Sequence, residues 1–277
     1  MKTISLPSGR SVPALGQGTW NMGDRRETRA EEIAALRLGI DRGLTLIDTA
    51  EMYGSGRSEE LVAEAIGGRR EEVFLVSKVL PENASRHGAI AACEKSLKRL
   101  KTDRLDLYLL HWRGSVPFAE TLEAFDRLQA DGKIRSHGVS NLDFDAMREW
   151  HSLEGGEKAA TNQVLYNLTR RGVEWDLAPW LREKRIALMA YSPLEQARLV
   201  NHKGLAAFGK KYAMTPAQAA LAWLLAQQDV IAIPKSGNRK RIEENLGAAD
   251  KPLAAAQLVE LDSLFPPPPR ARPLEML

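Results

Sequence analysis

A short apolar segment followed by an amphipathic helical pattern recurs along the whole chain, and this alternation limits the fold more than any other feature. Continuous apolar runs are typical of parallel strands that are buried on both faces. Alternation of such strands with helices predicts a parallel sheet covered by helices. Strands are expected at Ala14–Gly18, Leu44–Asp48, Val73–Lys78, Leu105–His111, Ser136–Ser140, Ala160–Val164, Ile186–Tyr191 and Val230–Ile233.

Eight strand-helix units follow one another without a linker, which favours one domain, residues 1–277, folded as a closed (β/α)8 barrel. The length of 277 residues fits, since such barrels take about 250 residues. Apolar stripes at helical spacing, such as Ile33, Leu36 and Ile40, would pack on the outside of the barrel. The alternative is an open, doubly wound α/β sheet, which usually contains fewer strands.

The two ends of the chain have patterns of their own. Near the N-terminus, Ile4–Leu6 and Ser11–Pro13 flank the turn sequence Pro-Ser-Gly-Arg and predict a small β-hairpin that closes the barrel floor. Near the C-terminus, the four prolines at Pro266–Pro269 exclude a helix or a central strand. The last dozen residues are therefore expected to form a tail across the surface.

Composition narrows the class of protein. The apolar fraction of 44% and the charged fraction of 27% predict a globular chain. A net charge of +3 is too mild for a nucleic-acid footprint. The single cysteine, Cys93, lies on an apolar helical stripe and is expected to be a buried thiol. With no signal peptide or membrane span in the pattern, we expect a cytoplasmic monomer.

Four polar residues fall at or just after the carboxyl ends of predicted strands: Asp48, Tyr53, Lys78 and His111. In a (β/α)8 barrel these ends meet at one mouth, where the chemistry of such enzymes is found. Each residue also has an ordinary structural reading: a helix cap, a rim aromatic, a surface lysine and a core imidazole. Four coincidences at one mouth are a weaker explanation than one site.

The four side chains make chemical sense together as a proton-donating group. A tyrosine has a pKa near 10, and a lysine cation beside Tyr53 would lower it. A buried lysine tends to lose its proton, so Asp48 is needed to keep Lys78 charged. His111 would then orient a carbonyl oxygen. This set contains no activated nucleophile for acyl transfer and no reductant, so a hydride must come from a cofactor.

Four separated motifs carry a resemblance to one family: Leu46–Gly54, Val76–Lys78, Asp106–Trp112 and Gly138–Asn141. In order and spacing they resemble the aldo-keto reductases over nearly the whole chain, and most of all bacterial reductases of methylglyoxal and keto sugars. The resemblance implies a catalytic tetrad of Asp48, Tyr53, Lys78 and His111, with Tyr53 as the general acid. It assigns no metal.

The cofactor is expected after the last strand. The run Gly54–Glu59 lacks the third glycine of a dinucleotide fingerprint and is better explained as the turn into a helix. The segment Ile233–Asn245 combines a strand end, a turn, basic residues and a helix start, where barrels commonly bind phosphate. This favours NADPH over NADH. By resemblance, the cofactor contacts are Gly18, Thr19, Ser140, Asn141, Gln163, Tyr191, Ser192, Pro193, Leu194, Lys235, Ser236, Arg241, Glu244 and Asn245.

Within that resemblance, Lys235, Ser236 and Arg241 hold the 2′-phosphate, while Glu244 and Asn245 meet the adenine. Ser140, Asn141 and Gln163 bond the carboxamide of the nicotinamide, and Tyr191 stacks beneath its ring.

Trp20 and Trp112 are expected to line the substrate pocket beside the tetrad, and the short loop Trp112–Val116 would leave it open to small carbonyl compounds. Two other functions remain in view. The chain could be a nucleotide-binding regulatory subunit on the same barrel, against which the intact tetrad argues. Lys78 could instead form a Schiff base in an aldolase-like barrel, but that needs a neutral amine, and Asp48 should keep it charged.

Overall fold

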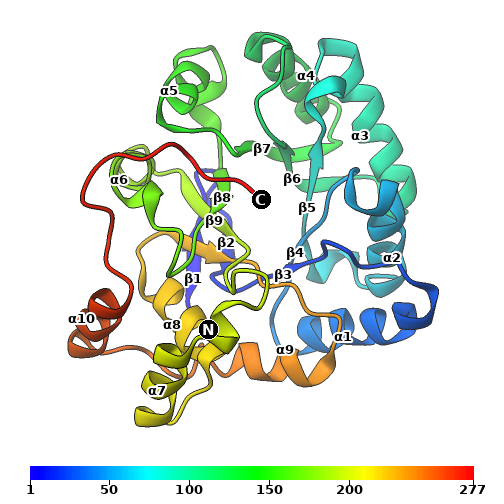
Figure 1. The fold of residues 1–277 in the computed structure, drawn as a ribbon. Coiled ribbons are helices and arrows are strands. Elements are labelled where there is room, and N and C mark those ends of the chain that lie inside the picture. Colours follow the sequence, from blue (N-terminus) through cyan, green and yellow to red (C-terminus); the bar gives the residue numbers. More distant parts are fainter.

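A computed structural model describes residues 1–277 and shows parallel strands curled into a barrel, with helices on the outside (Figure 1). The sheet runs in sequence order from β3 to β10. Its strands are β3 (Gln17–Gly18), β4 (Leu46–Asp48), β5 (Phe74–Val79), β6 (Leu105–Leu110), β7 (Ile134–Ser140), β8 (Thr161–Leu165), β9 (Ala187–Tyr191) and β10 (Val230–Ala232). Parallel bridges between Leu15 and Ala232 and between Gly18 and Lys235 join the first strand to the last. The predicted barrel is confirmed, and the open sheet is wrong.

A helix follows each strand. The helices are α1 (Arg29–Asp41), α2 (Arg57–Ala65), α3 (Arg86–Leu100), α4 (Phe118–Ala130), α5 (Phe144–Ser152), α6 (Leu177–Glu183), α7 (Lys203–Lys211), α8 (Pro216–Ala226), α9 (Arg239–Leu246) and α10 (Ala255–Leu264). Both α7 and α8 lie between β9 and β10, and α10 is added after the last unit. The predicted stripe on α1 faces inward, with Leu36 and Ile40 buried in the outer core.

An N-terminal hairpin closes the floor of the barrel. Its strands, β1 (Thr3–Ser5) and β2 (Ser11–Pro13), pair in antiparallel fashion. Ile4, Leu6 and Val12 of this segment belong to one buried cluster with the inward-facing strand residues. The floor was predicted from the turn sequence, and the structure confirms it. Because apolar side chains fill the lower barrel, the polar site is confined to the carboxyl ends of the strands.

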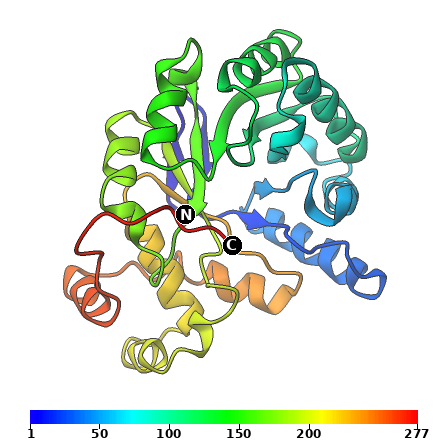
Figure 2. The same ribbon diagram turned by 45° about the horizontal axis from the view of Figure 1, so that its top comes forward.

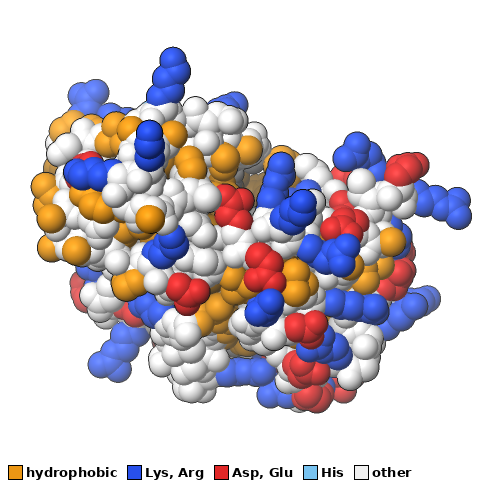
Figure 3. All heavy atoms as spheres, turned by 90° about the horizontal axis from the view of Figure 1, so that it is seen from below, with side chains coloured by type: hydrophobic (Ala, Val, Ile, Leu, Met, Phe, Trp, Pro, Cys, Tyr) orange, Lys and Arg blue, Asp and Glu red, His pale blue; other side chains and the backbone are white.

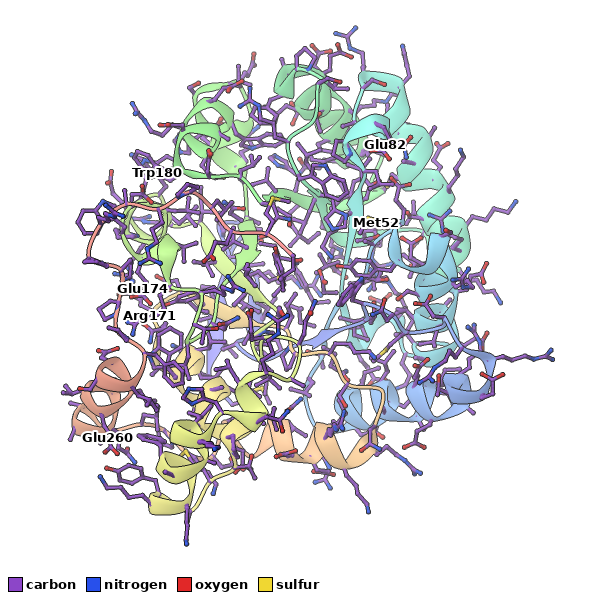
Figure 4. The ribbon with its side chains drawn as sticks, in the orientation of Figure 1. Met52, Glu82, Arg171, Glu174, Trp180 and Glu260 are labelled. Atoms are coloured by element: carbon purple, nitrogen blue, oxygen red, sulfur yellow. The ribbon has the colours of Figure 1, made fainter.

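The C-terminal tail returns to the barrel after α10. Figure 2 shows it in red, crossing from α10 toward the centre of the molecule, without helix or strand as expected. Arg171 fixes the start of this segment: its guanidinium donates to Asp262 at 2.7 Å and to the carbonyl of Phe265 at 2.6 Å. The same side chain pairs with Glu174, which lies beside it in Figure 4.

The surface has mixed charge. On the face drawn in Figure 3, Lys and Arg side chains are interspersed with Asp and Glu. No helix combines the length and the apolar character that crossing a bilayer requires. Cys93 is fully buried, as predicted, and burial raises the pKa of its thiol to about 12. This thiol is therefore an apolar packing group at neutral pH.

One buried histidine lies away from the barrel mouth. His137 of β7 is 1% exposed, and neither ring nitrogen has a hydrogen-bond partner. Its ring packs against Phe125 and Trp150. Burial is the main cause that lowers the pKa of His137 to about 4. The ring is therefore neutral in the folded protein at pH 7.

Replacing His137 with leucine should reduce the acid sensitivity of the fold. In wild type the unfolded state binds a proton near pH 6.5, whereas the folded state does not until about pH 4, so stability falls as the pH drops through that window. The lost stability is about 3 kcal/mol. Measured by urea unfolding, the free energy of unfolding should fall between pH 7 and pH 4 by about 3 kcal/mol less in His137→Leu than in wild type. The exposed His87, changed to glutamine, is the control. Equal pH dependence in wild type and His137→Leu would contradict the assignment.

Candidate active site

The four predicted tetrad residues meet at the barrel mouth. Asp48 is the last residue of β4, Lys78 lies on β5 and His111 directly follows β6. Tyr53 follows β4 in the loop that leads to α2. The Lys78 Nζ donates to Asp48 Oδ2 at 2.8 Å and lies 3.1 Å from the Tyr53 hydroxyl. The rings of Tyr53 and His111 meet edge to face at 5.9 Å.

Lys78 is a buried cation with all three donors used. Its side chain is 0% exposed and that of Asp48 is 3% exposed. The third N–H reaches the carbonyl of Thr49 at 2.9 Å, a partner that the sequence did not indicate. Burial alone would lower the pKa of Lys78, but Asp48 and Tyr53 outweigh it, so the pKa lies above its ordinary value. The lysine therefore stays charged, as the sequence argument required.

The environment of Tyr53 differs from the simple expectation. Burial raises the pKa of its phenol, and the nearby Lys78 cation offsets only part of that effect, so the net pKa lies above 10. The interaction with Lys78 does lower the pKa of Tyr53, as expected from the sequence. The net pKa is nevertheless raised, because burial has the larger effect, so the expectation of a lowered pKa is wrong. At neutral pH Tyr53 is therefore fully protonated and able to donate.

His111 is neutral at the mouth. Burial first, and then the charge of Lys78, lowers the pKa of its imidazole to about 2. Its Nδ1 is buried without a hydrogen-bond partner, and its ring packs at a tilt of 54° against that of Trp112, with the ring centroids 4.8 Å apart. A neutral imidazole carries one N–H group. If the hydrogen is on Nε2, which unlike Nδ1 is not buried without a partner, the ring presents a hydrogen-bond donor to a ligand. His111 can thus donate to a ligand oxygen without adding charge.

The glycine run after Tyr53 forms a turn, as the preferred reading proposed. Gly54, Ser55 and Gly56 all have positive φ, at 57°, 56° and 92°. A Cβ on Gly56 would lie 2.5 Å from Arg99, which bonds the fully buried Glu59 at 2.5 Å. The turn and the first residues of α2 therefore fix the loop that carries the phenol.

A second polar group lies across the mouth. The Ser140 hydroxyl donates to the backbone carbonyl of Gln163, and Asn141 donates to the backbone carbonyl of His111. The Tyr191 hydroxyl is 3.1 Å from Asn141 Oδ1. Gln163 Nε2 donates to Asp48 Oδ1 at 2.8 Å. The structure thus brings together the four residues assigned by resemblance to a nicotinamide, and links two of them, Asn141 and Gln163, directly to tetrad residues.

The loop after β9 is held by residues that the sequence reasoning missed. Four of its members, Ser192 and the run Glu195–Ala197, have positive φ without being glycine. Such backbone costs energy and needs support. Glu195 is 4% exposed and pairs with Arg170 at 2.8 Å, while Asn167 donates to Glu195 and to the carbonyl of Ser192.

Arg170 also pairs with Glu275 of the tail at 2.5 Å, so one side chain joins the loop and the tail. Because Asn167 comes two residues after the end of β8, the rule of polar residues at strand ends was the signal that could have found it. The cofactor contacts expected in this loop are Ser192, Pro193 and Leu194.

The basic segment after β10 is exposed, as a binding surface must be. Lys235 and Arg241 are exposed and Ser236 is buried. Asn238 caps α9 by accepting from the backbone N–H of Arg241. Lys235 bridges Gly18, so this segment lies against the end of β3, which leads into Thr19. The expected adenine contacts, Glu244 and Asn245, lie on α9 in the following turns.

Apolar side chains form the rim of the mouth. Trp20, in the loop after β3, is 47% exposed, and Met52, beside the tetrad tyrosine, is 40% exposed (Figure 4). Trp112 is partly buried next to His111. The two tryptophans were predicted here and Met52 was not. A polar centre with an apolar rim suits a ligand with one oxygen to bind and a small apolar body.

Comparison with known proteins agrees with this geometry. The model of the aldo/keto reductase family matches residues 14–265. The chain is 48% identical over 281 residues to the methylglyoxal reductase YeaE of Escherichia coli, which covers 100% of this chain and 99% of the relative. It is 35% identical to the glyoxal reductase of Bacillus subtilis, over 95% of this chain and 92% of the relative.

Solved structures of aldo-keto reductases also align with this chain over nearly its whole length. A crystal structure of an aldo/keto reductase from Klebsiella pneumoniae in complex with NADP and acetate aligns with a TM-score of 0.97 at 48% identity, covering 100% of this chain and 99% of the other. A thermostable aldo-keto reductase, Tm1743, in complex with the inhibitor epalrestat, aligns with a TM-score of 0.87 at 38% identity, over 95% of this chain and all of the other.

Changing Arg170 to alanine should destabilise the fold more than loss of an ordinary surface pair. It would leave the buried Glu195 with only the exposed Arg198, 3.6 Å away, as a cation, at a cost of about 2 kcal/mol. The matched control is Arg113→Ala, whose pair with Glu149 is about half exposed on both sides and contributes less than about 1 kcal/mol. Chemical denaturation measures both. Equal losses in the two variants would show that Arg170 does not support the loop.

Proposed function

Because this chain belongs to the aldo/keto reductase family, we propose that it reduces small aldehydes and ketones to alcohols with NADPH, and that Tyr53 supplies the proton. One observation carries the proposal: the buried Lys78 ammonium bonds Asp48 and the Tyr53 hydroxyl at the same time. That arrangement places a protonated phenol, a fixed cation and a neutral imidazole around one opening. It suits protonation of an oxygen that gains negative charge.

The chain's residues act on the carbonyl oxygen. When bound, NADPH supplies the hydride that the carbonyl carbon receives. His111, being neutral, donates a hydrogen bond that orients the oxygen without itself releasing a proton. Tyr53 gives its proton to the oxygen as charge develops there, and Lys78 stabilises the phenolate that remains. Asp48 keeps that lysine charged throughout.

The residues for the cofactor fit a phosphorylated dinucleotide. Lys235 and Arg241 offer two exposed cations at the start of α9, which suits the 2′-phosphate. At the other end, Asn141 and Gln163 offer amide groups for the carboxamide, and the ring of Tyr191, whose hydroxyl lies 3.1 Å from Asn141 Oδ1, is the proposed stacking partner of the nicotinamide. Complexes of the similar Klebsiella pneumoniae proteins with NADP and NADPH support this assignment.

The substrate class follows from the rim and from the relatives. The apolar side chains of Trp20, Met52 and Trp112, in loops at the mouth end of the barrel, favour a carbonyl compound with a small apolar body. The similar proteins described as methylglyoxal reductase and glyoxal reductase support small dicarbonyl compounds as the first candidates. Methylglyoxal is therefore the substrate to test first.

The direct experiment is titration of the purified protein with NADPH, followed by absorbance decay at the nicotinamide band after methylglyoxal is added. Binding with turnover supports the reductase. Binding without turnover of any carbonyl in a panel of aldehydes and ketones would favour the second candidate, a regulatory nucleotide-binding subunit on the same barrel. Absence of NADPH binding would contradict both.

Changing Tyr53 to phenylalanine should lower kcat by about 10²- to 10⁴-fold while the dissociation constant for NADPH changes less than about threefold. The ring is kept and only the hydroxyl that faces Lys78 is lost. Steady-state kinetics and fluorescence titration measure the two effects. A kcat within a few-fold of wild type would mean that another group donates the proton.

Changing Lys235 and Arg241 together to alanine should weaken NADPH binding by about 10- to 100-fold and leave NADH binding nearly unchanged, since only NADPH carries the 2′-phosphate. Titration with each cofactor measures this. The matched control is Lys240→Ala, which removes a neighbouring exposed cation to which no contact is assigned. Equal weakening of both cofactors would contradict the phosphate assignment.

A further inference from the structure

Gln163 connects two opposite walls of the barrel. It lies on β8, the sixth strand in the order of the sheet, whereas Asp48 ends β4, the second strand. Three strands lie between them on each side of the eight-stranded barrel, so their hydrogen bond of 2.8 Å crosses the lumen. Each residue is 2% exposed. The contact therefore joins the strand carrying the expected carboxamide ligand to the strand carrying the tetrad carboxylate.

The orientation of the Gln163 amide follows from charge. Asp48 is a carboxylate paired with a lysine cation, and an amide oxygen turned toward it would be repelled. The amide nitrogen must then face Asp48, and it also lies 2.9 Å from the sulfur of Met189, a weak acceptor. The remaining atom, Oε1, accepts no hydrogen bond from the chain. It is available to a donor from outside the protein, such as a carboxamide N–H.

The hydrogen bond from Gln163 gives a partner to the second carboxylate oxygen of the buried Asp48. Asp48 Oδ2 accepts from Lys78, and Oδ1 accepts from Gln163. Without that donor, Oδ1 would be a buried carboxylate oxygen lacking its partner, which disfavours the charged state. Lys78 and Asp48 would then share their proton more readily as a neutral pair. The cation beside the Tyr53 hydroxyl depends on Gln163 in this way.

We propose that Gln163 is a positioning residue for the proton donor: by bonding Asp48 across the barrel, it keeps Lys78 charged and aimed at the Tyr53 hydroxyl. This role adds to its expected contact with the nicotinamide carboxamide, and the link to catalysis rests on the proposed reductase function. One side chain thus joins the group that holds the hydride donor to the group that delivers the proton.

The first test needs no cofactor and no turnover. The ionisation of Tyr53 is followed by NMR of protein labelled with ¹³C-tyrosine, the resonance being assigned by its loss in Tyr53→Phe. The charged groups that face this phenol are Lys78 and Asp48, and His111 is neutral there. Gln163→Met, similar in length but without a donor, should raise the pH at which Tyr53 ionises, because the lysine cation is weakened. An unchanged titration would overturn the proposal.

Ser140→Ala is the matched control for that titration. Its hydroxyl bonds the backbone of Gln163 and is assigned to the same carboxamide, but it makes no hydrogen bond to Asp48. It should leave the ionisation of Tyr53 where it is in wild type. A shift as large as that of Gln163→Met would overturn the proposal by showing that the titration responds to any loss at this end of the site.

The second test separates positioning from cofactor binding. Gln163→Met should lower kcat by about 10- to 100-fold in the wild-type background. In the Asp48→Asn background the same change should lower kcat less than about twofold, because the bond to the carboxylate is already gone. If Gln163→Met instead lowers kcat by the same factor in both backgrounds, Gln163 acts only through the nicotinamide. If the proteins bind NADPH but reduce nothing, the proposed function fails, while the tyrosine titration still decides the role of Gln163.

Discussion

The ammonium group of Lys78, buried completely inside a protein barrel, is the constraint on which the rest of the site depends. Removing such a charge from water costs several kcal/mol unless a counter-charge and hydrogen bonds replace the lost solvent. The chain meets this demand with one carboxylate, one backbone carbonyl and one phenol, which take all three N–H groups. The phenol is thereby held beside the ammonium group at the barrel mouth.

The barrel supplies what this arrangement needs. Adjacent parallel strands bring Asp48, Lys78 and His111 to one edge, and the turn after Tyr53 is fixed by left-handed residues and by the buried Glu59. The N-terminal hairpin and the apolar lower barrel keep water away from beneath the lysine. Exclusion of water also leaves His111 neutral, so Lys78, beside the phenol, is the only cation among the four tetrad residues.

Much of this was predictable because it follows from periodicity and from strand ends. The eight strands, the hairpin floor, the tail and the meeting of Asp48, Lys78 and His111 came from the sequence with boundary errors of up to three residues, the largest at the start of β3. The net pKa direction of Tyr53 did not, because it depends on how burial compares with the effect of one cation. Contacts across a closed barrel, such as Gln163 with Asp48, also need the stagger of the strands, which no local pattern contains.

The loop after β9 illustrates the same limit. Its left-handed residues are not glycines, so nothing in the local sequence marks the bend, and the contacts of the buried Glu195 with Arg170 and Asn167 show how it is supported. By contrast, the basic segment after β10 could be identified from the sequence, because its exposed cations need no distant partner to be recognised. Sequence reasoning therefore located the polar residues that meet at the mouth, and it missed the side chains that hold the surrounding loops in place.

The central claim is that a hydride from NADPH reaches the carbonyl carbon while the chain protonates the oxygen. It is tested most directly by incubating the protein with methylglyoxal and NADPH deuterated at C4 of the nicotinamide, and analysing the alcohol by mass spectrometry and NMR. We expect one deuterium on the carbon that was the carbonyl carbon, with no covalent adduct on Lys78. An alcohol whose new C–H hydrogen comes from solvent, or a protein that carries the substrate on Lys78, would contradict it.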